Sequence, residues 1–414
     1  MTTEKRVLFL CAETFPPPYA FLQKVFNEQL REQGFRFVWI MPSMMETGEI
    51  KETDWDGNPV ILIPKIRPQG MADLIQVYWK HLKNIQRASQ LASERYGSFR
   101  ILQVRDDPAM AYVGWRLAKR VNISFVYQLS HLKEEELMMY TRMRIYGNPI
   151  KNAVQGRVGF FLRNFFLRRA DLVFPISDQM KKTLASYGVP TSRIVTLPEG
   201  ADTSIEPMAF DEEAKAIRKK LGLQDKKVIT YVGTMNRFRQ LDFLLGVLKL
   251  VLLDHPKAHL LMVGTGKDPE DLEWLKAKTS ELGVQQNVTF TGWVSREKVP
   301  AYIRGSDVGV SPIPTNGIYI NSSPIKLLEY LALEVPVVAT DIPEQKRIIE
   351  ESGAGICVPW DREKFAGAIE EILNLTDAER RAMGQRGRAW VQKYRDFSVL
   401  AERVYRAYDG ILSG

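Results

Sequence analysis

The sequence predicts an α/β protein of two doubly wound, Rossmann-like domains, each a parallel sheet covered by helices. Its 414 residues exceed one ordinary hydrophobic core and fit two domains. Short β-rich apolar runs alternate with longer helix-patterned stretches almost from end to end, the order expected of parallel sheets. The same alternation restarts near Lys227, after a polar and charged stretch from 201 to 225. We therefore expect a first domain at 1–203 and a second at 204–390.

The apolar runs mark the expected strands. In the first half they are Arg6–Cys11, Phe35–Ile40, Val60–Ile63, Ile101–Val104, Ser124–Tyr127 and Leu172–Pro175. In the second half they are Lys227–Val232, His259–Val263, Asn287–Phe290, Val308–Ser311, Val335–Thr340 and Gly355–Val358. Ligands of such sheets bind beyond the carboxyl ends of the strands, so the residues that directly follow strands are the candidates for function.

The composition limits the class of protein. The chain is 45% hydrophobic and 26% charged, close to globular averages. Cys11 and Cys357 each lie in an apolar run, which favours a reducing compartment over a disulfide framework or a thiolate metal site. No segment approaches the roughly 20 apolar residues of a membrane-spanning helix. We expect a cytoplasmic protein.

The first candidate for ligand binding is the turn after the strand Lys227–Val232. It begins with Gly233 and carries Arg237 and Arg239 before a helix expected near Leu241. Glycine lets the backbone approach a ligand, and a helix N-terminus beside an arginine suits a diphosphate. A merely solvated basic turn is the alternative.

The second candidate is the stretch 321–330, NSSPIKLLEY. Ser323 fits an N-cap and Pro324 the first helical position, so a helix with open N–H groups is expected to start here. Lys326 and Glu329 lie three apart and share a face, which allows an ion pair. A carboxylate beside a buried sheet edge needs a partner, and the hydroxyls of a ribose are the other choice for Glu329.

Three stretches together resemble a known family. They are LLMVGTGKDPEDLEWL, NVTFTGWVSREKVPAYIRGSDVGVSP and SPIKLLEYLALEVPVVATD, within roughly 228–358. They are similar to the donor domain of the retaining family-four glycosyltransferases of the GT-B type, also known as glycosyl transferases group 1. The resemblance implies two Rossmann-like domains facing a central cleft, with a C-terminal helix, 391–414, that crosses back to the N-terminal domain.

The same resemblance implies an activity. Such an enzyme transfers a sugar from a nucleotide-sugar donor to a glycan, lipid-linked or small-molecule acceptor, with retention of anomeric configuration. It uses neither a metal nor another cofactor. Charge on the leaving nucleotide would be stabilised by Arg239, Lys326 and helix N–H groups.

Individual roles follow by matching positions to the family. Glu329 matches the glutamate that holds the donor ribose, Arg239 the basic residue on the diphosphate, and Trp293 and Val294 the turn that cradles the base. His131 matches a histidine that lines the cleft near the transferred sugar, although a lone histidine is more often structural. The catalytic candidates are His131, Asn321, Arg239 and Lys326, and the donor-binding candidates are Gly233, Thr234, Arg239, Gly264, Trp293, Val294, Ser322, Ser323, Pro324, Ile325, Lys326 and Glu329.

Two positions depart from the family. Asn321 stands where a glutamate contacts the transferred sugar, and Thr234 where an arginine follows the glycine. Each change removes a charge, which leaves open a non-catalytic nucleotide-sugar-binding or scaffold protein of a glycan pathway. An epimerase of the same fold is a further alternative, but it needs its own acid and base.

Two other features were weighed. Asp54-Trp55-Asp56 is a DxD triplet of the kind that binds divalent cations, but the Gly57 that follows it fits a tight turn.

Residues 142–182 hold nine Lys and Arg against two Asp, much of the net charge of +8, with aromatics interleaved in Gly159–Phe166. This segment suits an anionic membrane at the inner face or a lipid-phosphate acceptor. The alternative, an ordinary helix with its aromatics packed inward, is favoured by the strand that follows. Nucleic-acid binding is not expected, because no zinc spacing or nucleic-acid motif accompanies the charge.

Overall fold

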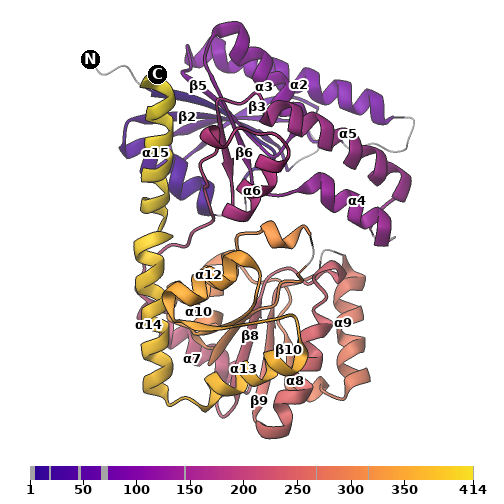
Figure 1. The fold of residues 1–414 in the computed structure, drawn as a ribbon, viewed down its shortest axis with the longest axis vertical. Helices are drawn as coiled ribbons and strands as arrows, with labels where there is room; N and C mark the ends of the chain where they lie inside the picture. Colours follow the sequence, from indigo (N-terminus) through magenta and orange to yellow (C-terminus); the bar gives the residue numbers. More distant parts are fainter. Residues whose placement is uncertain are drawn as a thin grey trace. The chain divides into compact units, whose positions relative to one another are not determined.

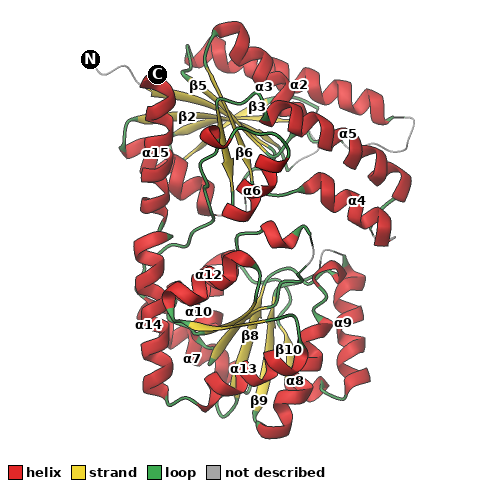
Figure 2. Ribbon diagram, viewed as in Figure 1, coloured by secondary structure: helices red, strands yellow, loops and turns green. Residues whose placement is uncertain are grey.

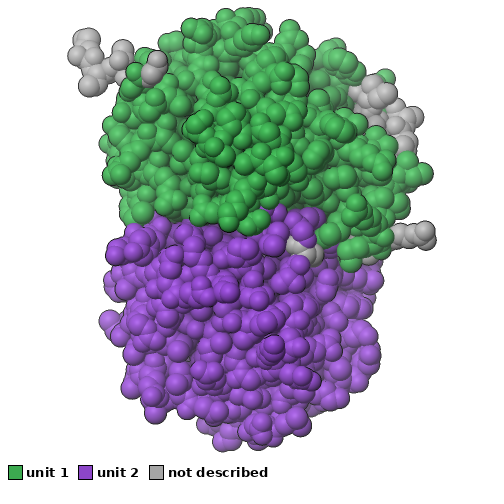
Figure 3. All heavy atoms as spheres, viewed as in Figure 1, with its two compact units in different colours: residues 1–198, 397–414 green, residues 199–396 purple. Residues whose placement is uncertain are grey.

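The computed structural model describes residues 5–17, 20–44, 48–66, 73–143, 146–266, 268–315 and 317–413. Strands and helices alternate along the chain (Figures 1 and 2). The chain forms two compact units, unit 1 with residues 1–198 and 397–414 and unit 2 with residues 199–396 (Figure 3). The sequence placed these divisions at 203 and 390. The segment after Pro198 stays with unit 2 because Ala201 pairs with Asp396, whose carboxylate also accepts a hydrogen bond from the backbone N–H of Thr203 at 3.2 Å.

The sheet of unit 1 contains every strand that the sequence predicted and one more. Its order is β3-β4-β2-β1-β5-β6-β7, parallel except for the β3–β4 pair. The strands are β1 (Lys5–Cys11), β2 (Phe35–Pro42), β3 (Lys51–Trp55), β4 (Asn58–Ile63), β5 (Ile101–Arg105), β6 (Ser124–Leu129) and β7 (Leu172–Pro175). The sequence missed β3 because all but its last residue are exposed and polar.

The DxD triplet forms the end of β3 and the turn into β4. Asp56 and Gly57 both have positive φ, the geometry of a tight hairpin. The Asp54 carboxylate accepts a hydrogen bond from the Gly57 N–H at 2.7 Å, and the Asp56 carboxylate accepts one from the Gln23 amide at 2.8 Å. The two carboxylates therefore serve the turn and its neighbour.

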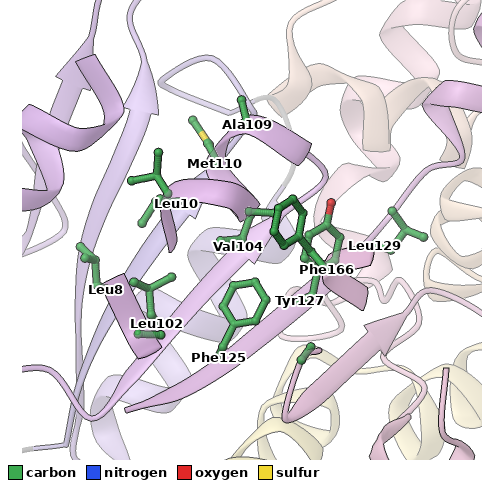
Figure 4. Packing of buried hydrophobic residues seen from close by; sticks show 14 of the residues in the cluster. Leu8, Leu10, Leu102, Val104, Ala109, Met110, Phe125, Tyr127, Leu129 and Phe166 are labelled. Carbon is green, nitrogen blue, oxygen red and sulfur yellow. The ribbon is translucent and has the colours of Figure 1, made fainter. Parts of the chain in front are cut away.

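Two helical layers cover the sheet of unit 1. The described helices of this unit are η1 (Leu22–Gln29), α1 (Leu30–Glu32), α2 (Leu74–Tyr96), α3 (Pro108–Val121), α4 (Lys133–Met143), α5 (Pro149–Leu167), α6 (Asp178–Ser186), η2 (Thr191–Arg193) and α15 (Phe397–Ser413). Along β1, Leu8 and Leu10 enter the core under α2, α3 and α5 (Figure 4), whereas Val7 and Phe9 enter the core under η1 and α15. This alternation is what a sheet buried on both faces requires.

The C-terminal helix belongs to unit 1, as the sequence led us to expect. The Tyr408 hydroxyl donates to the buried Gln103 on β5, and Lys5 forms an ion pair with Asp409 at 2.9 Å. The helix starts at Phe397 rather than at 391, because α14 (Asp377–Tyr394) of unit 2 continues to Tyr394.

The sheet of unit 2 has the order β10-β9-β8-β11-β12-β13, and all its pairs are parallel. Its strands, all predicted, are β8 (Lys227–Val232), β9 (Ala258–Val263), β10 (Val288–Phe290), β11 (Val308–Ser311), β12 (Val337–Thr340) and β13 (Gly355–Val358). Its other described helices are η3 (Pro207–Phe210), α7 (Asp211–Lys220), η4 (Arg237–Arg239), α8 (Asp242–Asp254), α9 (Pro269–Leu282), η5 (Gln285–Asn287), η6 (Arg296–Lys298), α10 (Val299–Arg304), η7 (Tyr319–Asn321), α11 (Ile325–Ala332), α12 (Pro343–Ser352) and α13 (Arg362–Asn374). The strand order reverses beside the first strand of each sheet, at β1/β5 and at β8/β11, and such a switch point is where doubly wound sheets bind ligands.

Tyr330 of α11 is built into the switch point of unit 2. Strand β8 pairs with β11 at Ile229 and Thr230. Beyond these two residues, the Tyr330 hydroxyl lies beside β8. It donates to the carbonyl of Thr230 and accepts from the N–H of Val232, both at 2.9 Å. Its ring lies on Gly309, where an added Cβ would be 2.6 Å from the nearest ring carbon.

Gly309→Ala is therefore expected to destabilise the protein by about 1–3 kcal/mol, because the new methyl group overpacks against a buried ring. Gly367→Ala is the matched control, since nothing lies within 4 Å of its added Cβ in the exposed part of α13. There alanine gains up to about 1 kcal/mol of helix propensity. Urea titrations of both variants measure the difference, and equal stabilities would contradict this account of α11 packing.

For the part of the chain that the structure describes, no helix is both long and apolar enough to cross a membrane.

Candidate functional site

Two glycines bring β8 and β9 close together at their carboxyl ends. Gly233 follows β8 with φ +138°, and Gly264 follows β9 with φ +131°, both in the region that favours glycine. The Gly233 N–H donates to the Val263 carbonyl at 2.9 Å, and a Cβ on Gly264 would lie 2.3 Å from the Gly233 carbonyl oxygen. The backbone at this edge therefore carries no side chain at Gly233 and Gly264, which would let a ligand contact main-chain groups there.

Helix α11, which carries Lys326 and Glu329, begins near the same edge. Its N-cap is Pro324, so the expected cap at Ser323 is wrong. The Ser323 hydroxyl instead accepts the N–H of Glu199 at 3.1 Å, which turns it away from the helix. Ile325 begins the helix, whose first-turn N–H groups lack intrahelical partners.

Lys326 is held in an environment that disfavours its charge. Burial, and secondarily the positive charge of Arg239, lower the pKa of Lys326 to about 7, and Glu329 opposes this only in part. The ammonium lies 5.3 Å from the centre of the Tyr231 ring. Among the described residues no carboxylate lies within 4 Å of it, so the ion pair with Glu329 that the spacing allowed is not formed. Lys326 and Arg239 thus present two cations that favour an anion.

Glu329 lies three residues further along α11, half-buried. Burial raises the pKa of its carboxyl, and Arg296 and Lys326 lower it to a smaller extent. A carboxylate in this state gains from hydrogen-bond donors, because bonds to the charged form offset the lost hydration.

Arg239 reaches this edge from the turn that follows Gly233. The Asn236 side chain caps η4 by accepting the Arg239 N–H at 3.0 Å, and the Arg239 guanidinium lies 5.8 Å from the Tyr319 ring centre. Thr234 is exposed, and its carbonyl accepts the Tyr231 hydroxyl at 3.0 Å. The structure therefore brings Arg239, from the turn after β8, near Lys326 of α11, two basic residues that the sequence could only name separately.

The loop between β11 and α11 is anchored to the sheet. The Thr340 hydroxyl accepts the N–H of Ile313 at 2.8 Å and donates to its carbonyl at 2.7 Å. The Asn321 side chain is 3% exposed and donates to the Gly317 carbonyl at 3.0 Å, while the Ser322 hydroxyl donates to the Tyr319 carbonyl at 2.7 Å. Both side chains bond within their own loop, and a catalytic role for Asn321 stays a prediction.

The turn after β10 completes this edge. Gly292 has φ +70° and its carbonyl accepts the Gly264 N–H at 3.2 Å. Trp293 is 77% exposed, whereas Val294 packs against the core. The turn therefore presents an aromatic surface beside the glycines.

A polar cluster lies at the switch point of unit 1. Asp106 follows β5 with φ +64° and accepts the Ser130 N–H at 2.7 Å. The Arg105 guanidinium lies 3.5 Å from the Asp106 carboxylate. Burial raises the pKa of Glu13, which follows β1, while Arg105 lowers it and Asp106 raises it further.

His131 belongs to this cluster. Its Nε2 lies 3.1 Å from the Glu136 carboxylate, and its side chain is 43% exposed. Burial lowers the pKa of His131, but the hydrogen bond with Glu136 and the nearby carboxylates outweigh it, so the net shift is upward. The sequence identified His131 but missed Glu13, Arg105 and Asp106. Their signal was their position at the carboxyl ends of the two strands that flank the switch point.

No group of three or more His, Cys, Asp or Glu side chains that could hold a metal ion occurs among the residues with described positions.

Comparison with known proteins assigns the chain to a family and its fold to a type. Residues 226–375 match the family described as glycosyl transferases group 1, and residues 27–200 match the glycosyl transferase 4-like domain. Sucrose-phosphate synthase from Thermosynechococcus elongatus aligns with a TM-score of 0.75 at 18% identity, over 99% of both chains. Anabaena HepE in complex with UDP-glucose aligns with a TM-score of 0.68 at 16% identity, over 98% of this chain and 99% of that one. These likenesses show the GT-B fold.

Curated relatives are more similar in sequence. The GDP-mannose-dependent alpha-(1-6)-phosphatidylinositol monomannoside mannosyltransferase of Mycobacterium tuberculosis is 28% identical over 261 residues, 62% of this chain. The chain spans 64% of that relative's length. The alpha-monoglucosyldiacylglycerol synthase of Streptococcus pneumoniae is 24% identical over 330 residues, 78% of this chain and 68% of that protein. With both of its domains matched in order, the chain belongs to the glycosyl transferases group 1 family.

Proposed function

We propose that this protein is a hexosyltransferase that moves a sugar from a nucleoside-diphosphate sugar to an acceptor, with retention of configuration and without a metal. The observation that carries the proposal is the pair of cations at the switch point of unit 2. Burial, and secondarily the positive charge of Arg239, lower the pKa of Lys326 to about 7. A bound anion relieves this cost.

A diphosphate is the anion that fits this edge best. The bare backbone at Gly233 and Gly264 and the first-turn N–H groups of α11 add donors to the two cations. As the bond between the sugar and the diphosphate breaks, negative charge grows on the leaving phosphate. Fixed cations and N–H dipoles stabilise that charge more than the ground state, which is the work a divalent cation does in other transferases.

Glu329 is the group for the ribose. It lies one helical turn from Lys326 and is not consumed in an ion pair with it, so both carboxylate oxygens can accept hydroxyl hydrogens. The exposed Trp293 supplies a flat surface for the base beside Gly292. The names of relatives include both GDP-mannose-dependent and UDP-glucose-binding proteins, so the base and the sugar are left to experiment.

The acceptor side is proposed for the Glu13–His131 cluster of unit 1. It combines a carboxyl group with a raised pKa and a histidine at a switch point, and such groups suit the binding of hydroxyls and the movement of protons. Retention with no assigned covalent nucleophile implies that the acceptor attacks from the face that the diphosphate leaves.

A thermal-shift panel of UDP-, GDP-, ADP- and TDP-sugars, measured with and without EDTA, tests the donor site. We expect one nucleotide family to stabilise the protein, by about 2.7 kcal/mol at a hundredfold excess over Kd. Glu329→Ala should lose most of this shift, whereas Glu371→Ala, at an exposed site on α13, should keep it. No shift from any donor would overturn the proposal, and a shift that EDTA abolishes would overturn its metal independence.

The pH dependence of nucleoside-diphosphate binding tests Lys326. In the free protein the pKa of Lys326 is about 7, and a bound diphosphate raises it, so above pH 7 binding must take up a proton. Affinity is expected to fall by up to about tenfold per pH unit above 7, with proton uptake visible by calorimetry in buffers of different ionisation enthalpy. Lys326→Arg should flatten the profile because arginine stays charged. A profile that is already flat in the wild type would contradict this role.

His131→Ala is expected to slow turnover by about a hundredfold or more, measured as nucleoside diphosphate formed from the donor that the thermal-shift panel identifies. The Kd of the nucleotide should change less than about threefold. The reason is that His131 belongs to unit 1, whereas the residues assigned to the nucleotide all belong to unit 2. His255→Ala, at the end of α8, serves as the control. Unchanged turnover in His131→Ala would remove His131 from the reaction.

A further inference from the structure

Helix α5 exposes four of its apolar residues. Ile150, Val154, Val158 and Phe161 are 68%, 54%, 53% and 72% exposed. Their spacings of four, four and three residues place them on one face of the helix. We call these four residues the apolar stripe. Three polar side chains of the same helix, Asn152, Arg163 and Asn164, are instead buried, each 7% exposed or less.

Close packing against α4 fixes this orientation. The two helices lie side by side (Figure 1), and a Cβ on Gly156 would be 2.8 Å from the Glu134 carbonyl, while one on Gly159 would be 2.8 Å from Glu134 Cγ. Arg163 is fully buried and donates to Glu134 at 2.6 Å and to Glu135 at 2.7 Å. Turning the apolar stripe inward would expel these pairs and place bulky side chains where only glycine fits. The sequence favoured aromatics packed inward, and Phe166 does so, but Phe161 does not.

The charged side chains of α5 and of the two residues after it are all cationic. Helix α5 contains no Asp or Glu, and Lys151 and Arg157 lie on it. Arg168 and Arg169 follow at its end, with the Arg169 guanidinium 3.5 Å from the Phe165 ring centre. Arg144, part of the basic segment in the sequence, lies outside the described residues. A face of apolar side chains bordered by long cations is the pattern of a helix that lies in a membrane interface.

We propose that the outer face of α5 docks on an anionic lipid bilayer, with the apolar stripe at the boundary of headgroups and acyl chains. Lys151 and Arg157 then contact lipid phosphates. A second copy of this chain suits the face less well, because two such helices would bring like charges together. The docking does not depend on the donor site. Its consequence, an acceptor carried in the membrane and reached by unit 1, does rest on the proposed function.

Flotation with two kinds of vesicle tests the docking. We expect the wild type to bind vesicles of phosphatidylcholine and phosphatidylglycerol in equal parts, and to bind phosphatidylcholine alone much more weakly. The double variant Val154→Ser with Phe161→Ser should bind the mixed vesicles at least about tenfold more weakly. Arg157→Gln should weaken binding mainly at low salt, because screening already reduces its contribution at high salt.

The controls separate docking from folding and from donor binding. Met208→Ser with Leu253→Ser removes two similarly exposed apolar side chains of unit 2, at 72% and 78%, and should leave vesicle binding unchanged. The Val154→Ser and Phe161→Ser double variant should match the wild type both in thermal stability and in the thermal shift with each nucleotide sugar. This comparison holds whether or not the wild type shows a shift. Equal vesicle binding by the double variant and the wild type would overturn the proposal. So would a dimer in solution that the double variant dissociates without any vesicle binding by the wild type.

Discussion

The hydroxyl of Tyr330 is the contact on which the site of unit 2 depends. By bonding to the carbonyl of Thr230 and the N–H of Val232, it satisfies main-chain groups of β8 beside the switch point. The ring needs the space that Gly309 leaves on the neighbouring strand. These contacts fix α11 against the sheet, and α11 in turn sets where Lys326 and Glu329 lie. A buried polar group without such a partner would cost about 1–3 kcal/mol, so the arrangement is strongly preferred.

Both units bury ionisable side chains, but those of unit 1 form ion pairs with one another, whereas Lys326 and Glu329 of unit 2 do not. In unit 1 burial lowers the pKa of Arg163, but the hydrogen bonds that it donates to Glu135 and the charges of Glu134 and Glu135 outweigh burial, so the net shift is upward. That set is satisfied internally and positions a helix. In unit 2 burial lowers the pKa of Lys326 and raises that of Glu329, and the two do not form an ion pair. Groups kept in an unfavourable state reduce the stability of the free protein and are the ones a ligand can stabilise.

Unit 1 has a polar cluster at its switch point and an exposed apolar face on α5. Its switch point gathers Glu13, Asp106 and His131 where a small polar ligand could bind, whereas α5 presents the apolar stripe to the outside. The buried ion pairs of Arg163 with Glu134 and Glu135 help to hold α5 in the orientation that exposes this face. A polar contact within the unit thus determines an apolar surface on it.

The sequence by itself determined the two doubly wound sheets and every strand in them except β3, because the period of apolar residues is a local property that buried strands display directly. It also named Arg239 in the turn after a strand, and Lys326 and Glu329 on one face of a helix. Only the tertiary structure decided that Lys326 and Glu329 stay unpaired, that Ser323 bonds to Glu199 and that Glu13 and Asp106 join His131. It also decided that α5 faces outward. Burial, pKa and hydrogen-bond partners are set by neighbours distant in sequence, and no local pattern contains that information.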